Sequence, residues 1–135
     1  MKRMMMGVGI AAAIVCSTPL SAQDSGLEVT EVILSKALEN GRPVDPGASF
    51  SRRDGRIYCT VRVTNPSRTA TTIRVAWERA GGPASSTGIE LNIPARPRYR
   101  TVARTGTGRA AGRYRCVVYD ADDRELGAAE YELTE

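Results

Sequence analysis

Apolar and polar residues alternate in several short segments, which is the pattern of β-strands with one buried face. In the clearest segment, residues 57–63, Ile57, Cys59, Val61 and Val63 fall on one side and the residues between them on the other. Asn65-Pro66-Ser67 then ends this strand, because proline donates no ladder hydrogen bond. The same alternation predicts strands that centre on Ile73–Trp77, Ile89–Ile93, Tyr114–Val118 and Ala129–Leu133.

The first strand is less regular. Leu27 and Val29 fall on one face of this strand. The alternation slips by one residue at Thr30-Glu31 and resumes with Val32 and Leu34, which predicts a β-bulge. Leu34 to Glu39 is compatible with a single helical turn. Turn-forming or charged residues fill the intervals 41–49, 81–88, 105–112 and 120–127, which we expect to be loops. The pattern predicts an all-β fold: an antiparallel immunoglobulin-like β-sandwich of about seven strands.

The amino terminus predicts export. Lys2 and Arg3 precede an apolar run from Met4 to Cys16, and small residues follow up to Ala22. This order is typical of a cleavable signal peptide over residues 1–22, which leaves one domain over 23–135 in the periplasm or outside the cell. The apolar run is shorter than the roughly 20 residues of a membrane span. A lipid anchor at Cys16 is an alternative.

The amino-acid composition excludes several kinds of catalytic and metal site. The 135 residues include no histidine and three cysteines, which excludes a Ser-His-Asp relay, an imidazole metal ligand and a four-cysteine zinc site. We therefore expect no enzyme activity, no metal and no cofactor, although a hydrolase with an Asp/Glu pair stays open. The formal net charge is +4, and the signal peptide carries two of these charges, so nucleic acid is not the expected partner.

Two cysteines remain after export, and their setting suggests a disulfide. Cys59 and Cys116 lie on the apolar faces of an early and a late strand, with Trp77 inward on a strand between them. Tyr114 stands two residues before Cys116, as in the tyrosine corner of immunoglobulin-like sandwiches. We expect an inter-sheet disulfide packed against the indole, the alternative being two reduced core thiols.

The order of motifs resembles a bacterial family known as domain of unknown function 2914. The resemblance covers almost all of the exported chain, and it implies an exported or membrane-attached accessory domain of β architecture with no established activity. It rests on Glu39-Asn40-Gly41-Arg42-Pro43, Phe50, Arg56 to Val63, Thr72-Ile73, Trp77, Tyr99-Arg100-Thr101, Gly112 to Cys116, and Leu126.

Charge is distributed unevenly near the carboxyl end. Residues 96–115 contain seven arginines and no acid, whereas 120–135 contain seven acids and one arginine. Cross-strand pairing between these segments is one explanation. The other is a basic surface for an anionic partner, made by Arg98, Tyr99, Arg100 and Arg104. The acids at 120–123 offer oxygen ligands for calcium, but they fit a charged hairpin turn better.

These observations favour a non-catalytic binding or accessory module of the bacterial cell envelope. Its partner would be a protein or an anionic envelope component that the sequence does not identify. The alternative is a structural or assembly subunit whose last strand, Ala128 to Thr134, pairs with the sheet edge of another protein.

Overall fold

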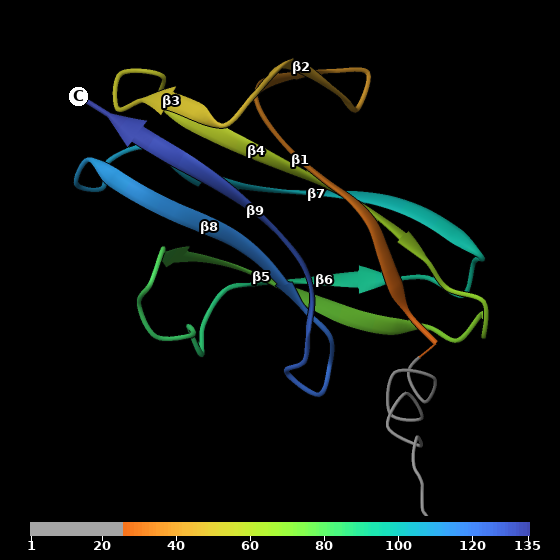
Figure 1. Ribbon diagram of the computed structural model, residues 1–135. Coiled ribbons are helices and arrows are strands. Elements are labelled where there is room, and N and C mark those ends of the chain that lie inside the picture. The colour runs from red at the N-terminus through yellow and green to blue at the C-terminus, as the bar shows by residue number, and fades with distance from the viewer. Residues whose placement is uncertain (1–25) are drawn as a thin grey trace, which may run out of the picture.

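The computed structural model describes residues 26–135, which form nine strands (Figure 1). The predicted all-β fold is confirmed, but the predicted number of about seven strands is wrong. The predicted signal peptide and Cys16 lie outside the described residues. The strands are β1 (Glu28–Glu39), β2 (Arg42–Pro46), β3 (Ser49–Ser51), β4 (Arg56–Thr64), β5 (Thr71–Arg79), β6 (Ile89–Ile93), β7 (Arg98–Gly106), β8 (Gly112–Tyr119) and β9 (Glu125–Thr134).

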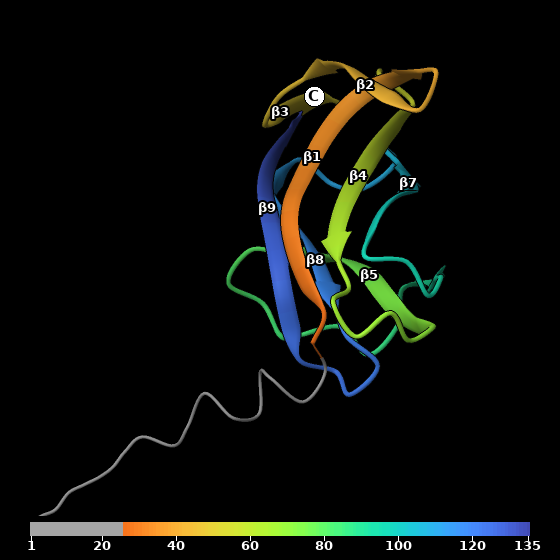
Figure 2. The same ribbon diagram turned by 90° about the vertical axis from the view of Figure 1, so that its right-hand side faces the viewer.

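The strands form two packed sheets (Figures 1 and 2). A four-stranded sheet has the order β2-β1-β4-β7, and a five-stranded sheet has the order β3-β9-β8-β5-β6. Neighbouring strands are antiparallel except for β3 and β9, which are parallel. The predicted antiparallel arrangement therefore holds for every pair but one. The exception arises because the chain passes from the edge of the four-stranded sheet at β2 to the edge of the five-stranded sheet at β3.

Strand β2 and the first residue of β3 lie in the segment 41–49, which the sequence predicts to be a loop, and the alternation names no strand over the residues of β7. Asn40 and Gly41 have φ values of 51° and 76°, and Glu39 pairs directly with Arg42 across them. This is a tight two-residue hairpin, in which Asn-Gly is favoured because both central residues need positive φ. The hairpin keeps β1 extended to Glu39, so the helical turn expected over Leu34–Glu39 is wrong.

Alternation places the apolar side chains between the sheets. Ile57, Cys59, Val61 and Val63 of β4 are 0–2% exposed, and β5, β8 and β9 contribute their own inward residues to the same core. The predicted bulge in the first strand is confirmed, because the β1–β4 register shifts between Val29 and Glu31. A single apolar core therefore holds both sheets together.

The β1–β2 hairpin bends across the outer face of the four-stranded sheet (Figure 2). Ser35 and Thr60 belong to this outward-facing side, yet they are only 0% and 1% exposed. The Arg100 guanidinium extends to the hairpin turn, where its Nη2 lies 3.4 Å from the position that a Cβ on Gly41 would take. The hairpin thus covers one part of this face and leaves open the end where β7 begins and β4 ends.

Candidate functional site

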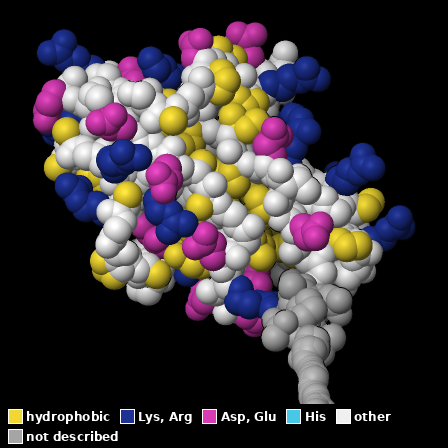
Figure 3. All heavy atoms as spheres, in the orientation of Figure 1, with side chains coloured by type: hydrophobic (Ala, Val, Ile, Leu, Met, Phe, Trp, Pro, Cys, Tyr) yellow, Lys and Arg dark blue, Asp and Glu magenta, His cyan; other side chains and the backbone are white. Residues whose placement is uncertain are grey.

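Strand β7 presents a row of arginines on the outer face of the four-stranded sheet. Tyr99 and Ala103 turn inward and pack on the core, so Arg98, Arg100 and Arg104 point outward, and all three are exposed. Basic side chains project along this side of the molecule in the space-filling view, near the start of β7 and the end of β4 (Figure 3). The alternation of the strand therefore gathers these guanidinium groups on one surface.

Two of the arginines line a groove of about 280 Å³, which we call the basic groove. Its lining includes three arginines and two threonines. The lining residues are Thr30, Arg62, Val63, Thr64, Arg98, Tyr99 and Arg100. Thr30 takes part through the bulge in β1, and its hydroxyl donates to the carbonyl of Arg62 over 3.3 Å. The groove therefore depends on the irregularity of the first strand as well as on β7.

The basic groove concentrates positive charge that the surrounding residues do not neutralise. Arg62 on β4 lies directly opposite Arg100 on β7, and like charges in this position destabilise a sheet. Only Arg62 has an acidic partner, Glu31, at 3.2 Å between Nε and Oε1. Within residues 26–135, Arg98 and Arg100 form no ion pair. Guanidinium groups in such a position are suited to hold carboxylate or phosphate oxygens.

Arg104 lies outside the basic groove, although the sequence groups it with Arg98 and Arg100. It lies four residues further along β7, opposite Tyr58. There it contributes to an apolar hollow of about 400 Å³ that has Leu38, Tyr58, Ile89, Val102, Ala103 and Arg104 as its lining. The four predicted binding residues are therefore divided between two neighbouring depressions, and sequence reasoning missed Arg62 because it lies on a different strand.

The arginines of β8 have a different environment. Arg113 pairs with Glu130 at 3.6 Å and Arg115 pairs with Glu125 at 3.0 Å, both across the β8–β9 ladder. These are exposed or half-exposed pairs, each worth less than about 1 kcal/mol. The charge asymmetry of the sequence thus has two explanations, because β8 pairs with the acidic strand β9 whereas β7 does not.

The acidic segment 120–123 forms a turn. The Asp120 carboxylate accepts hydrogen bonds from the backbone N–H groups of Asp122 and Arg124, at 2.8 and 2.9 Å, and Asp123 has a φ of 64°. Among residues 26–135 no group of three or more acidic or cysteine side chains is arranged to hold a metal ion. Asp120 therefore stabilises its own turn.

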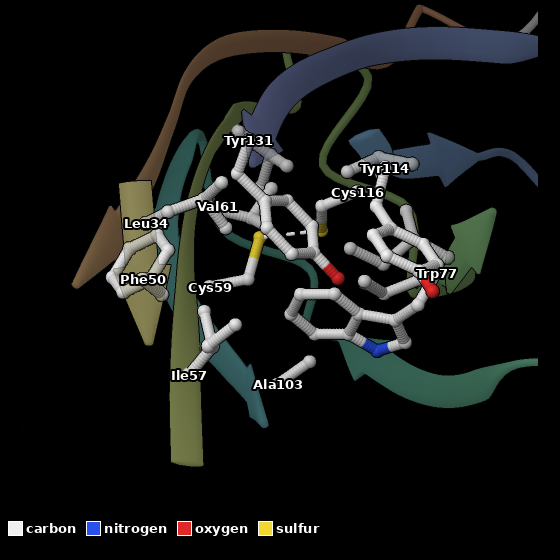
Figure 4. Close-up of a cluster of buried hydrophobic side chains, with 14 of the residues drawn as sticks. Leu34, Phe50, Ile57, Cys59, Val61, Trp77, Ala103, Tyr114, Cys116 and Tyr131 are labelled. Carbon is white, nitrogen blue, oxygen red and sulfur yellow. Dashed lines mark hydrogen bonds between the residues drawn. The ribbon is translucent and has the colours of Figure 1, made fainter. Parts of the chain in front are cut away.

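The two cysteines meet at the centre of the core (Figure 4). The Cys116 thiol donates to the Cys59 sulfur over 2.9 Å, and both residues are 0% exposed. The hydrogen bond to Cys59 and burial both raise the pKa of the Cys116 thiol. Both cysteines are free thiols in the structure, so the disulfide stays a prediction. The sulfurs come from opposite sheets, and a bond between them would join the two layers.

Aromatic side chains surround the cysteine pair. The Trp77 ring packs edge-on against Tyr131 at 6.3 Å between ring centroids, and Tyr114 stacks on the same tyrosine at 5.6 Å. The Tyr114 hydroxyl donates to the carbonyl of Ala110 over 2.6 Å and accepts from Arg79 over 3.0 Å. A tyrosine that bonds the backbone four residues upstream has the contact of a tyrosine corner.

Sequence reasoning missed a buried polar cluster on the outer face of the five-stranded sheet. The Glu78 carboxylate is only 5% exposed, and it accepts hydrogen bonds from the Tyr119 hydroxyl and from the Ser85 backbone N–H. Arg74 covers the Tyr119 ring at 4.4 Å and donates to the carbonyls of Ser85 and Thr87. Burial, and secondarily Glu78, raise the pKa of Tyr119 to about 12. The cluster fastens the β5–β6 loop to the sheet.

Neither end of β9 is isolated from the rest of the sheet. Its residues pair with β8 along their length, and Glu132 to Thr134 also pair with β3. Gly127 lies against Val29 of β1, with 3.0 Å between a Cβ built on the glycine and the valine Cγ1. The last strand therefore already has neighbours within this chain. Residues 26–135 contain no helix that is long and apolar enough to cross a membrane.

Comparison with solved structures finds similar backbones at low identity. Beta-glucosidase from Kluyveromyces marxianus in complex with glucose is 12% identical with a TM-score of 0.48. The Pseudomonas fluorescens alkylpurine DNA glycosylase AlkC bound to DNA containing an abasic site analog is 14% identical with a TM-score of 0.52. The aligned regions cover 81% and 86% of this chain but only 14% and 33% of those proteins. The similarity to the glycosylase concerns the fold alone, because a shared fold does not imply a shared function.

Comparison of the sequence identifies a similar protein family over part of the chain. No curated protein matches the chain. The family model described as "Protein of unknown function (DUF2914)" matches residues 70–133, from β5 into β9. The predicted resemblance to this family is thereby confirmed over these strands, and the motifs between Glu39 and Val63 lie outside the match.

Proposed function

We propose that the protein is a non-catalytic binding module of the bacterial cell envelope, and that the basic groove holds an anionic partner. The observation that carries this proposal is the like-charged pair Arg62 and Arg100, directly opposite each other, with Arg98 beside them in the same groove. Placing like charges together costs stability. An anion that bridges the guanidinium groups would remove that repulsion.

The chemistry of the groove supports an oxygen anion as the ligand. Arginine donates two parallel hydrogen bonds to a carboxylate or phosphate, and the hydroxyls of Thr30 and Thr64 lie on the same lining. Carboxylates of cell-wall peptides, phosphates of lipid headgroups and acidic proteins all present such oxygens. Binding by exposed guanidinium groups is screened by salt, so the proposal predicts affinity that falls as ionic strength rises.

The compartment and the finer fold belong to the same proposal. Export follows from the predicted signal peptide at 1–22, and a disulfide between Cys59 and Cys116 suits the oxidising periplasm. The strand orders β1-β4-β7 and β9-β8-β5 correspond to the A-B-E and G-F-C orders of immunoglobulin-like sandwiches. In that correspondence the two cysteines occupy strands B and F, Trp77 occupies strand C, and Tyr114 precedes the second cysteine.

The experiment compares retention of the purified exported domain on its own envelope fractions at low and high salt. The test variant is Arg98→Gln/Arg100→Gln. Each lost charge-assisted contact is worth about 1.5 kcal/mol, so we expect the double variant, which loses two, to bind roughly a hundredfold more weakly. Arg113→Gln is the matched control, because Arg113 is 74% exposed and pairs with Glu130 on β8, away from the groove.

The outcome separates the site from general charge. Loss of retention in Arg98→Gln/Arg100→Gln with unchanged retention in Arg113→Gln supports the basic groove. Equal losses per arginine removed would instead show that only net charge matters. Retention that is unaffected by all three changes would overturn the proposal.

A further inference from the structure

We propose that the outer edge of β7 docks an extended acidic segment of another protein, which adds to the four-stranded sheet as a further strand. This inference names the partner class of the proposed binding function and rests on it. Addition of a strand to a sheet edge gives affinity through main-chain hydrogen bonds and specificity through side chains at alternate positions. The edge of β7 provides both requirements.

The main-chain requirement follows from the position of β7. It is the last strand of its sheet, and it pairs with β4 over nine consecutive residues without a bulge. The Asn65 N–H donates to the Pro97 carbonyl over 2.8 Å, so Pro97 and the odd-numbered residues after it point their backbone groups toward β4. The even-numbered residues, Arg98 to Gly106, point theirs away from the sheet. Within residues 26–135 no backbone hydrogen bond joins these groups to another segment.

The edge of β7 is longer than the other unpaired edges. β2 and β6, the remaining outermost strands of substantial length, have five residues each, and β3 has three. Proteins commonly protect a long edge with a bulge or an inward charge. β7 has neither of these; its exposed arginines repel other basic strands but leave nine residues available for an acidic partner strand.

The side chains on the same edge define what the partner must carry. Arg98, Arg100 and Arg104 are exposed and, within residues 26–135, have no ion pair. Val102 lies between them on the lining of the apolar hollow, which also includes Ala103 from the inward face of β7 and so wraps around the edge. Ile89 of β6 lines the same hollow. It is 37% exposed, and it is the one large hydrophobic residue among residues 26–135 that is exposed.

Charge complementarity therefore selects an acidic strand with one apolar position. Pairing antiparallel to β7, the partner would present acidic side chains opposite the three arginines and an apolar side chain opposite Val102. Read from its amino end, the pattern is acidic, any, apolar, any, acidic, any, acidic. Two copies of β7 would bring arginines face to face, and like charges across strands are unfavourable, so the edge repels itself while attracting this partner.

The probe is a synthetic nine-residue peptide with Glu at its second, sixth and eighth positions, Val at its fourth and Thr elsewhere. The control peptide has the same composition with its three Glu residues consecutive. We expect the patterned peptide to bind at least about tenfold more tightly at low salt. Its binding should also slow amide hydrogen exchange at Arg98, Arg100, Val102 and Arg104, which a purely electrostatic contact would not do.

A substitution on the protein tests the main-chain contact. Val102→Pro removes an outward N–H without removing a donor to β4, and proline is tolerated at such edge positions. Val102→Ala is the control, since it trims the same side chain and keeps the N–H. Loss of one edge hydrogen bond and the fixed proline ring should weaken peptide binding about tenfold relative to Val102→Ala.

The results distinguish this inference from the proposed function. If both peptides bind equally, with no slowing of amide exchange in the unaltered protein, strand addition is overturned while an arginine-dependent anion site stands. If the patterned peptide fails to bind at low salt, the inference is likewise overturned. If envelope retention does not depend on Arg98 and Arg100, the proposed function itself fails. Amide exchange in the unaltered protein keeps the test decisive should Val102→Pro not fold.

Discussion

Oxidation of Cys59 and Cys116 should strongly stabilise the domain. Forming the disulfide removes one hydrogen from each thiol and transfers two electrons to an oxidising disulfide, such as that of a thiol–disulfide oxidoreductase. The sulfurs are 2.9 Å apart and come from opposite sheets, so a bond needs only a small approach of the two side chains. Because both residues are 0% exposed, the bond must form before the sandwich closes, or during transient opening.

The magnitude follows from the length of chain that the bond would close. The cysteines are 57 residues apart, for which loop-closure entropy gives a stabilisation of about 4 kcal/mol at 25 °C. Native domains are stable by only about 5–15 kcal/mol in total, so this contribution is a large share. For a domain of this size it corresponds to a rise in Tm of roughly 15–25 °C.

Urea unfolding of oxidised and reduced protein measures this difference directly. Comparing two redox states of one chain avoids the cavity that a cysteine substitution would leave in the core. Mass spectrometry should show that the oxidised form is about 2 Da lighter than the reduced form, as the loss of two hydrogens requires. Two titratable thiols in unfolded, periplasmically produced protein would refute the disulfide. Equal unfolding midpoints for verified oxidised and reduced samples would refute the entropic argument.

Three further predictions concern stability. Tyr114→Phe removes the 2.6 Å hydrogen bond to the Ala110 carbonyl and should lower the free energy of unfolding by about 1–2 kcal/mol in urea; an unchanged midpoint would contradict a structural role for the corner. Gly88→Ala places a Cβ 2.5 Å from the Val75 carbonyl oxygen, so its thermal unfolding should begin at a clearly lower temperature, whereas an unchanged Tm would show that the backbone yields easily. Burial raises the pKa of Tyr131 to about 12 from an ordinary value of 10, so the stabilisation by its neutral phenol is complete below pH 10 and is lost as the pH rises toward 12. Urea unfolding midpoints measured across this pH range should therefore fall less in Tyr131→Phe than in the unaltered protein. Parallel falls in the two proteins would contradict the assignment.

Alternation predicts most of the strands that carry the core, because a half-buried strand repeats every two residues whatever its neighbours are, but it does not identify β7. The bulge at Thr30 was predictable for the same reason, since the period of two breaks there. The strands β2 and β3 were not predictable from the sequence, because they lie in a segment rich in turn-forming residues. Their pairing depends on the Asn40-Gly41 hairpin and on the edges of two different sheets.

The candidate site shows where local pattern stops being informative. Arg98 and Arg100 are neighbours on one face of one strand, so the sequence identified them together. Arg62 joins them through the pairing of β4 with β7, which no local spacing encodes. Glu78 looks in sequence like an outward polar residue, and it is buried because the β5–β6 loop folds over it. Both omissions come from contacts that the alternation within a strand does not encode.

The most direct test of the basic groove is an NMR titration of the domain with inorganic phosphate at low salt, following the side-chain Nε–Hε signals of its arginines. We expect saturable shifts at Arg98, Arg100 and Arg62, and much smaller changes at Arg113 and Arg115, which pair with acids of β9. Equal, non-saturating shifts at all five arginines would contradict this expectation, because they would mean that phosphate responds only to the overall positive charge of the protein.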